Sequence, residues 1–322
     1  MVHIRYIGNS NDFEFCRYAS ACRHRKEFQM QFGHFDDQQR EYVITDPRTP
    51  LPWINYLGSE DFFTLLSNTA GGYCFYRDAR LRRLTRYRYN NCPVDQEGFH
   101  IYIKDGKTVW NPGWQPTKTE LGRYTCRHGL GYSVIEGQKN GVSAAQTLLV
   151  PQGENCLLIR LCLKNETDIK KTLDVFPYVE FCLWDAMDDS SNFQRNFSIG
   201  EVELEPEAIY HKSEYRERRN HYAVLWANRP YDGFDTARDA FIGPYGSPAL
   251  PEAVAAGCCT GSIAHGWAPV GAMQFHLELC PGESQELFFG LGYVENPEGK
   301  KFSAPGVINK TRAHAMIGKY RT

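Results

Sequence analysis

The sequence predicts an all-β protein built as a large sandwich of two sheets. Short β-rich runs recur between residues 42 and 294, turn-forming dipeptides separate them, and no long amphipathic helix interrupts the series. A chain of 322 residues is also long for a seven-strand sandwich, so we expect a larger structure.

The predicted strands are recognised by alternating polarity or by enrichment in β-branched and aromatic residues. They are Tyr42–Thr45, Tyr73–Tyr76, Phe99–Ile103, Gln146–Val150, Leu157–Leu163, Thr172–Phe181, Gly200–Leu204, His221–Ala227, Met273–Leu279 and Glu286–Val294. Turn signals between them include Asp46-Pro47, Asp105-Gly106, Asn140-Gly141 and Pro281-Gly282. The charged segment Asn165–Lys171 separates two of the runs and predicts a hairpin tip.

The last residues differ from the rest of the chain. Residues 308–320 have helical composition, with one apolar stripe formed by Ile308, Ala313, Met316, Ile317 and Tyr320. No later segment follows that would cover this stripe, so the pattern predicts an interrupted chain.

The first 29 residues lack periodicity and carry a basic run, Arg23–Lys26. Residues 25–29 can be encoded by a purine-rich stretch of the kind that forms a bacterial ribosome-binding site shortly before a methionine codon. We therefore expect Met30 to be the true start and residues 1–29 to be a non-native or disordered extension. Amino-terminal sequencing of the native protein tests this expectation, and finding Met1 or Val2 would contradict it.

The composition excludes several functional classes. The chain is 42% hydrophobic and 23% charged, which is typical of a globular protein with a substantial core. A net charge of −2 argues against nucleic acid or an anionic membrane as a partner. No apolar run approaches the roughly 18 residues of a membrane span, and no signal-peptide pattern is present. The eleven cysteines lack metal-ligand spacing, which predicts no metal site and a reducing, cytoplasmic location.

The segment Glu180–Asn196 carries the densest set of functional groups. Trp184 and Phe193 supply aromatic rings, and the polar groups come from Asp185, Asp188, Asp189, Asn192, Gln194, Arg195 and Asn196. A pyranose has apolar C–H faces and a rim of hydroxyls, which suit flat rings and planar amide, carboxylate or guanidinium groups. The alternative is a buried strand followed by an ordinary polar turn.

Other motifs give weaker signals. The basic run Arg77–Arg88 resembles a nucleic-acid patch, but the overall charge favours a segment of internal ion pairs and packing. No phosphate-binding loop, nucleophile elbow or zinc-protease motif is present. The stretch Asp185–Asp189 lacks the spacing of a calcium loop. Neither Asp185 nor Asp189 is assigned as a general acid, because paired catalytic carboxylates are recognised by geometry.

From Met30 to the last residue, the sequence resembles the cellobiose phosphorylases of glycoside hydrolase family 94. The motifs that carry this resemblance are Thr49–Gly58, Ser67–Tyr73, Arg86–Asn91, Arg127–Tyr132, Glu180–Asn196, Tyr210–Arg219, Gly233–Thr236 and Leu291–Pro297. The resemblance implies a galactose-mutarotase-like β-supersandwich over residues 30–297. It also implies that residues 298–322 begin a helical linker to a missing (α/α)6 barrel.

The family's catalytic acid and phosphate-binding residues belong to that barrel. The resemblance therefore implies that this chain holds no catalytic residue and is inactive as a fragment. The whole enzyme is expected to cleave cellobiose with inorganic phosphate as co-substrate and without a cofactor. The products are α-glucose 1-phosphate, formed with inversion, and glucose. The resemblance further implies a homodimer.

The resemblance also implies substrate-binding roles for three residues. By motif, Arg195 is an active-site arginine, and Asn192 and Asp185 shape the acceptor-glucose side. Cellobiose phosphorylases have asparagine where this chain has Asp185, and an ionised aspartate only accepts hydrogen bonds. This difference keeps open a phosphorylase for a related β-glucoside or cellodextrin. A free-standing carbohydrate-binding module is the alternative from another class, and the downstream DNA sequence would decide between them.

Overall fold

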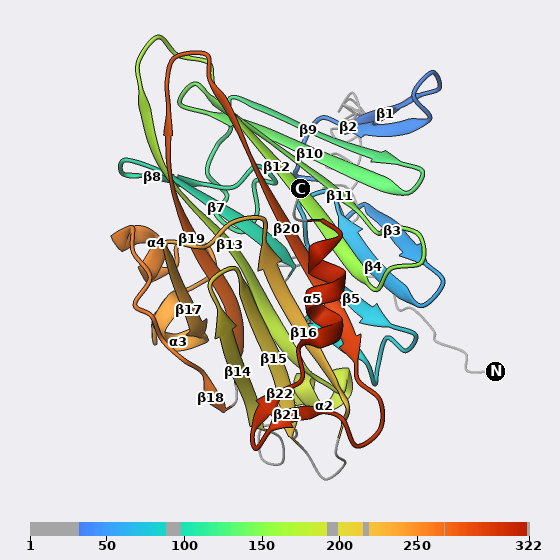
Figure 1. Ribbon diagram of the computed structural model, residues 1–322. Helices are drawn as coiled ribbons and strands as arrows, with labels where there is room; N and C mark the ends of the chain where they lie inside the picture. Colours follow the sequence, from blue (N-terminus) through green and yellow to red (C-terminus); the bar gives the residue numbers. More distant parts are fainter. Residues whose placement is uncertain (1–31, 88–97, 192–198, 215–218, 267, 321–322) are drawn as a thin grey trace, which may run out of the picture. The chain divides into compact units, whose positions relative to one another are not determined.

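Two large antiparallel sheets dominate the chain from Gly33 onward (Figure 1). The structure is a computed structural model that describes residues 32–87, 98–191, 199–214, 219–266 and 268–320. The predicted extension, residues 1–29, lies outside these ranges. None of the described helices is long and apolar enough to cross a membrane.

The first sheet has eleven strands. In spatial order they are β1 (Gly33–Asp36), β2 (Glu41–Ile44), β9 (Arg123–Gly129), β10 (Tyr132–Lys139), β11 (Val142–Leu149), β12 (Cys156–Asn165), β20 (Ser284–Glu295), β16 (His221–Ala227), β15 (Ala208–Glu214), β14 (Ile199–Glu205) and β18 (His265–Gly266). Every second residue of β11 is buried, which is the period of a strand with one face on a core.

The second sheet has nine strands. Along its main path they are β17 (Gly233–Ala237), β19 (Pro269–Leu279), β13 (Lys171–Trp184), β6 (Arg83–Thr85), β5 (Gly72–Tyr76), β4 (Phe62–Ser67) and β3 (Ile54–Ser59). The long strand β13 pairs along its first part with β7 (Phe99–Asp105), which pairs in turn with β8 (Thr108–Trp110). The last part of β13 pairs with β6, so this strand connects the β7–β8 pair with strands β6 to β3.

The main hydrophobic core lies between the two sheets. It includes Ile159, Leu225 and Leu291 from the first sheet and Val175 and Phe275 from the second, all nearly or fully buried. This arrangement confirms the expected two-sheet, all-β fold, and every predicted strand overlaps an observed one.

The predicted hairpin tip at Asn165–Lys171 is wrong. Strands β12 and β13 belong to different sheets, so this segment carries the chain from one layer to the other. The Asn165 side chain donates hydrogen bonds to the carbonyls of Leu279 and Cys280, where β19 and β20 make a second passage between the layers. Charge and turn composition are alike in hairpins and crossovers, which is why the sequence did not separate them.

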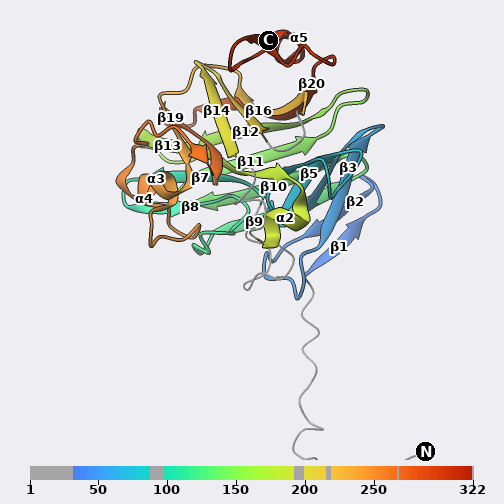
Figure 2. The same cartoon turned by 90° about the horizontal axis from the view of Figure 1, so that it is seen from below.

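Short helices cover the outer faces of both sheets. Helices α3 (Arg238–Ile242) and α4 (Glu252–Ala256) pack on the second sheet, where Phe241 stacks on Tyr178 with ring centroids 4.7 Å apart. After Pro297 the chain forms a small hairpin, β21 (Phe302–Ala304) and β22 (Val307–Ile308), and then helix α5 (Thr311–Gly318). Figure 2 shows α5 above the layer that contains β12, β16 and β20.

The expectation that the C-terminal apolar stripe is uncovered is wrong. Ala313, Met316 and Ile317 are buried against the outer face of the first sheet, on Tyr222 and Trp226 among others. Two glycines of β20 permit this contact, since a side chain at Gly290 would meet the Trp226 ring and one at Gly292 would meet Met316. Sequence polarity did not reveal that the first sheet has an apolar outer face at this place.

Candidate functional site

The chain turns sharply from β13 into helix α2 (Ala186–Ser191) within the segment singled out from the sequence. Trp184 has a φ of +76°, a conformation that bulky residues rarely adopt. Such a backbone costs on the order of 1–3 kcal/mol and persists only where the surroundings enforce it. Here Trp184 is fully buried, with its ring edge-on to His221 (4.3 Å) and Tyr293 (5.8 Å).

Asp185 caps the amino terminus of α2. Its Oδ1 accepts hydrogen bonds from the backbone N–H groups of Met187 (2.9 Å) and Asp188 (3.1 Å). Asparagine would fill the same capping role, because aspartate and asparagine are about equally favoured at this position. The second carboxylate oxygen, Oδ2, has no hydrogen bond to the described residues and is the atom left for a ligand.

A buried ion pair fixes α2 to the second sheet. Arg86, directly after β6, donates from Nε and Nη2 to the two oxygens of Asp189 at 2.7 and 2.8 Å. Both side chains are only 4% exposed. Two parallel hydrogen bonds define orientation as well as distance, so this pair restrains the helix more than a single contact would.

Glu180 extends the ion pair into a network. One oxygen accepts from Arg238 Nε (2.9 Å) and Tyr178 Oη (2.8 Å), and the other lies 3.4 Å from Arg86 Nη1. Burial alone would raise the pKa of Glu180, but Arg238 and Arg86 hold it below its usual value. The carboxyl group is therefore ionised near neutral pH, which suits a positioning role and not that of a general acid.

Unpartnered polar groups gather around the same turn. Trp184 Nε1, both ring nitrogens of His211, Ser213 Oγ and His221 Nε2 are buried and have no hydrogen-bond partner among the residues that the structure describes. Burial, with a smaller effect of Arg86, lowers the pKa of His211 to about 3. Burial and neighbouring cations also lower the pKa of His221 to about 3. Both rings are neutral at physiological pH, and each still has hydrogen-bonding capacity.

The structure tests the sequence-derived site only in part. Asp185 lies at the start of α2 as described, whereas Asn192 and Arg195 lie outside the described residues. The expectation that the basic run forms ion pairs within the protein is confirmed for its described residues, since Arg77 pairs with Asp61, Arg82 with Glu295, and Arg86 with Asp189.

Sequence reasoning missed the partners in this site. Arg86 and Asp189 are 103 residues apart, and Glu180 and Arg238 are 58 apart, so no local pattern joins them. His211 lay in one of the motifs that carried the family resemblance but was given no role. Within the described ranges, no group of three or more His, Cys, Asp or Glu residues is arranged to hold a metal ion.

The family model described as "Glycosyl hydrolase 94, supersandwich domain" matches residues 40–322. An N,N′-diacetylchitobiose phosphorylase of Vibrio furnissii is 37% identical over 284 residues, covering 85% of this chain and 35% of that protein. A solabiose phosphorylase of Paenibacillus borealis is 28% identical over 298 residues, covering 89% of this chain and 38% of that protein.

This chain therefore spans little more than a third of the length of these relatives. A solved structure from the human microbiome, assigned as a kojibiose phosphorylase, has a TM-score of 0.50 at 9% identity. That match covers 90% of this chain and 36% of the other, and at this identity it is a likeness of fold alone.

Proposed function

Since the chain belongs to the glycosyl hydrolase 94 supersandwich-domain family, we propose that it supplies part of the sugar site of a disaccharide phosphorylase. The whole enzyme would cleave a β-linked disaccharide with inorganic phosphate. The products would be the sugar 1-phosphate and the free monosaccharide. The main support for the proposal is the segment Glu180–Ser191, where a buried network of ion pairs holds the helix that Asp185 caps.

Within this proposal, Asp185, Asn192 and Arg195 bind the acceptor sugar through hydrogen bonds. The free Oδ2 of Asp185 accepts from a sugar hydroxyl, while Asn192 and Arg195 donate to others. Chemistry at the anomeric carbon belongs to a catalytic (α/α)6 domain, in which a general acid protonates the leaving oxygen as phosphate attacks. Glu180 is unsuited to that role, because two arginines keep it ionised.

The identity of the disaccharide is a separate part of the proposal. Cellobiose was expected from the sequence motifs, but the relatives described above are phosphorylases of N,N′-diacetylchitobiose and solabiose. We therefore rank N,N′-diacetylchitobiose first, on the support of the 37% identical relative, and cellobiose second.

One experiment tests the role of this chain. Saturation-transfer NMR would measure binding of N,N′-diacetylchitobiose, cellobiose and their monosaccharides to the 322-residue protein. We expect binding that Arg195→Ala abolishes and that Arg123→Ala, at a largely exposed arginine of β9, leaves unchanged. Binding that both variants retain would contradict the assignment of Arg195.

A second experiment tests the reaction. Phosphate-dependent release of a monosaccharide would be measured with this chain and with the longer polypeptide encoded when the downstream DNA is included. We expect turnover in the longer protein and none in the 322-residue chain. Robust turnover by the short chain, or none by the longer protein with either disaccharide, would overturn the proposal.

A free-standing carbohydrate-binding module is the second candidate. The structure removes one argument against it, since helix α5 is covered by the first sheet and does not need a further domain to bury its stripe. A downstream reading frame without a barrel domain would favour this candidate.

A further inference from the structure

A large groove opens between helix α5 and the ends of several strands. Its volume is about 1440 Å³. Its walls come from the end of β5, the turn between β11 and β12, the end of β20 with the segment after it, and one side of α5. Typical small-molecule sites measure roughly 300–1,000 Å³, so this groove suits an extended ligand.

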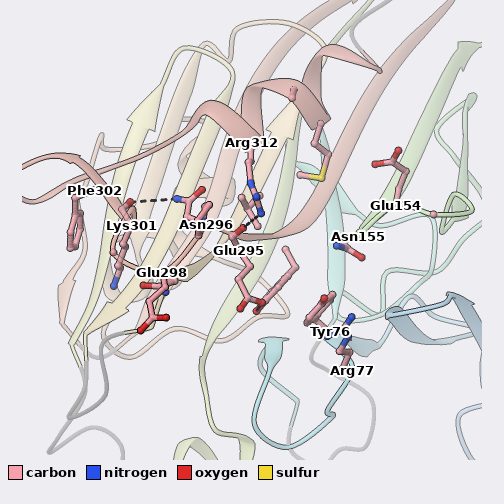
Figure 3. Close-up of a pocket in the computed structure, with 18 of the residues that line it drawn as sticks. Tyr76, Arg77, Glu154, Asn155, Glu295, Asn296, Glu298, Lys301, Phe302 and Arg312 are labelled. Carbon is pink, nitrogen blue, oxygen red and sulfur yellow. Dashed lines mark hydrogen bonds between the residues drawn. The ribbon is translucent and has the colours of Figure 1, made fainter.

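The groove carries amide groups with unused hydrogen-bonding capacity (Figure 3). The side chains of Asn155 and Asn220 line it and have no hydrogen bond to the described part of the chain. Asn296 is only 4% exposed, and its amide donates to the carbonyls of Lys301 and Asn309. The Asn296 Oδ1 atom is nevertheless left without a partner in the described ranges, which is costly for a buried acceptor.

Four of the charged side chains that line the groove form ion pairs within the protein, and the other three, Glu298, Lys301 and Arg312, are of mixed sign. Lys319 pairs with Glu154, and Arg77 pairs with Asp61 at 2.6 Å. Arg312 donates to the backbone carbonyl of Glu295 at 2.6 Å, and the Glu295 carboxylate pairs with Arg82. An anionic or cationic ligand would have to compete with these contacts. A neutral ligand that bears both donors and acceptors fits the groove better.

Apolar surface lies beside these amides. Val294 and Met316 line the groove, and the stacked rings of Tyr76 and Tyr293 lie beneath it with centroids 4.0 Å apart. Phe302 is 40% exposed at its edge. Amides next to apolar carbon match a sugar chain, which alternates hydroxyl edges with C–H faces.

We propose that this groove is a second carbohydrate-binding site, for a neutral oligosaccharide longer than a disaccharide. The ligand exchanges hydrogen bonds with the amides of Asn155 and Asn220. The site is separate from the proposed acceptor site at α2, although Tyr293 contacts Trp184 on its far side. Binding here requires no catalytic activity.

Isothermal titration of the protein with cellotetraose and with tetra-N-acetylchitotetraose tests the proposal. We expect one of them to bind, and the double variant Asn155→Ala/Asn220→Ala to bind at least about tenfold more weakly, since two neutral hydrogen bonds are lost. Neither side chain has a hydrogen bond to the described residues, so the thermal midpoint of the variant should equal that of the parent. Gln39→Ala, at an exposed amide in the turn between β1 and β2, is the matched control and should leave affinity unchanged.

Two results would overturn the proposal. One is the absence of binding of either tetrasaccharide by the parent protein, and the other is parental affinity in the double variant. The variant Asp185→Ala separates this site from the one at α2, because it should weaken disaccharide binding and leave tetrasaccharide binding intact. Loss of both on Asp185→Ala would show a single site at α2 and would also contradict the proposal.

Discussion

Arg86 and Asp189 form a doubly hydrogen-bonded ion pair, with nitrogen–oxygen distances of 2.7 and 2.8 Å, across 103 residues of sequence. The pair is buried and joins the end of β6 to helix α2. Through Glu180 it also reaches Arg238 at the start of α3. The geometry of the α2 turn therefore depends on charges contributed by distant parts of the chain.

Breaking this pair should destabilise the protein strongly. In Arg86→Met, Asp189 loses its cation and Glu180 keeps only Arg238, so buried carboxylate charge remains uncompensated. We expect the free energy of unfolding to fall by about 3–5 kcal/mol, measured by urea denaturation. Arg86→Lys keeps the charge but loses the paired geometry, and its loss should be smaller. Equal losses in the two variants would show that a positive charge without the fork geometry does not stabilise the turn.

The two buried histidines should make stability depend on pH. Their folded-state pKa values are about 3, below the ordinary 6.5, so protons bind the unfolded chain first as the pH falls. The free energy of unfolding should therefore decrease below about pH 6.5, by up to about 1.4 kcal/mol per pH unit for each histidine. Denaturation experiments between pH 7 and pH 5 measure this slope at pH values above those at which most carboxylates titrate.

His211→Phe provides the variant for that measurement. Phenylalanine keeps a ring against Phe181, which stacks on His211 at 4.8 Å, and removes the titrating group. The slope between pH 6.5 and pH 5 should become shallower. His34→Gln, at an exposed histidine of β1, should leave it unchanged. An unaltered slope in His211→Phe would contradict a buried, neutral His211.

Asp185 allows capping and ligand binding to be measured separately. Asp185→Ala should lower the free energy of unfolding by about 0.5–2 kcal/mol, because two backbone N–H groups of α2 lose their acceptor. Asp185→Asn should change it by only a few tenths, since asparagine caps as well. If Oδ2 accepts from a sugar hydroxyl, Asp185→Asn should nevertheless weaken disaccharide binding. Full binding by Asp185→Asn would restrict the residue to its structural role.

The docking of α5 can be tested at Ile317. Ile317 is 4% exposed and packs on the outer face of the first sheet, so Ile317→Ala should cost about 2–4 kcal/mol by thermal or urea unfolding. Ala315→Ser, on the exposed side of the same helix, should stay within about 0.5 kcal/mol of the parent. A similar small effect for both would mean that α5 contributes little to the folded unit.

Much of the fold could be read from local patterns. The alternation in β11 and the continuous apolar run of β16 were visible because strand burial repeats every two residues or covers both faces. Short edge strands such as β1 and β3 escaped notice, since each offers few residues to a pattern. The assignment of β12 and β13 to different sheets was also missed, because pairing is decided by partners remote in sequence.

The sequence by itself determined the sandwich class, the helix at the C-terminal end and the segment Glu180–Asn196 as the candidate sugar site. Tertiary structure decided what that segment does locally: Asp185 caps a helix, Asp189 holds Arg86, and Glu180 is kept ionised between two arginines. It also decided that α5 is covered and that a groove with unused amides lies beside it. The physical reason is the sequence distance between the interacting residues. Periodicity depends on neighbouring residues, whereas the protonation state, the partner and the exposure of a side chain depend on the groups that folding brings to it.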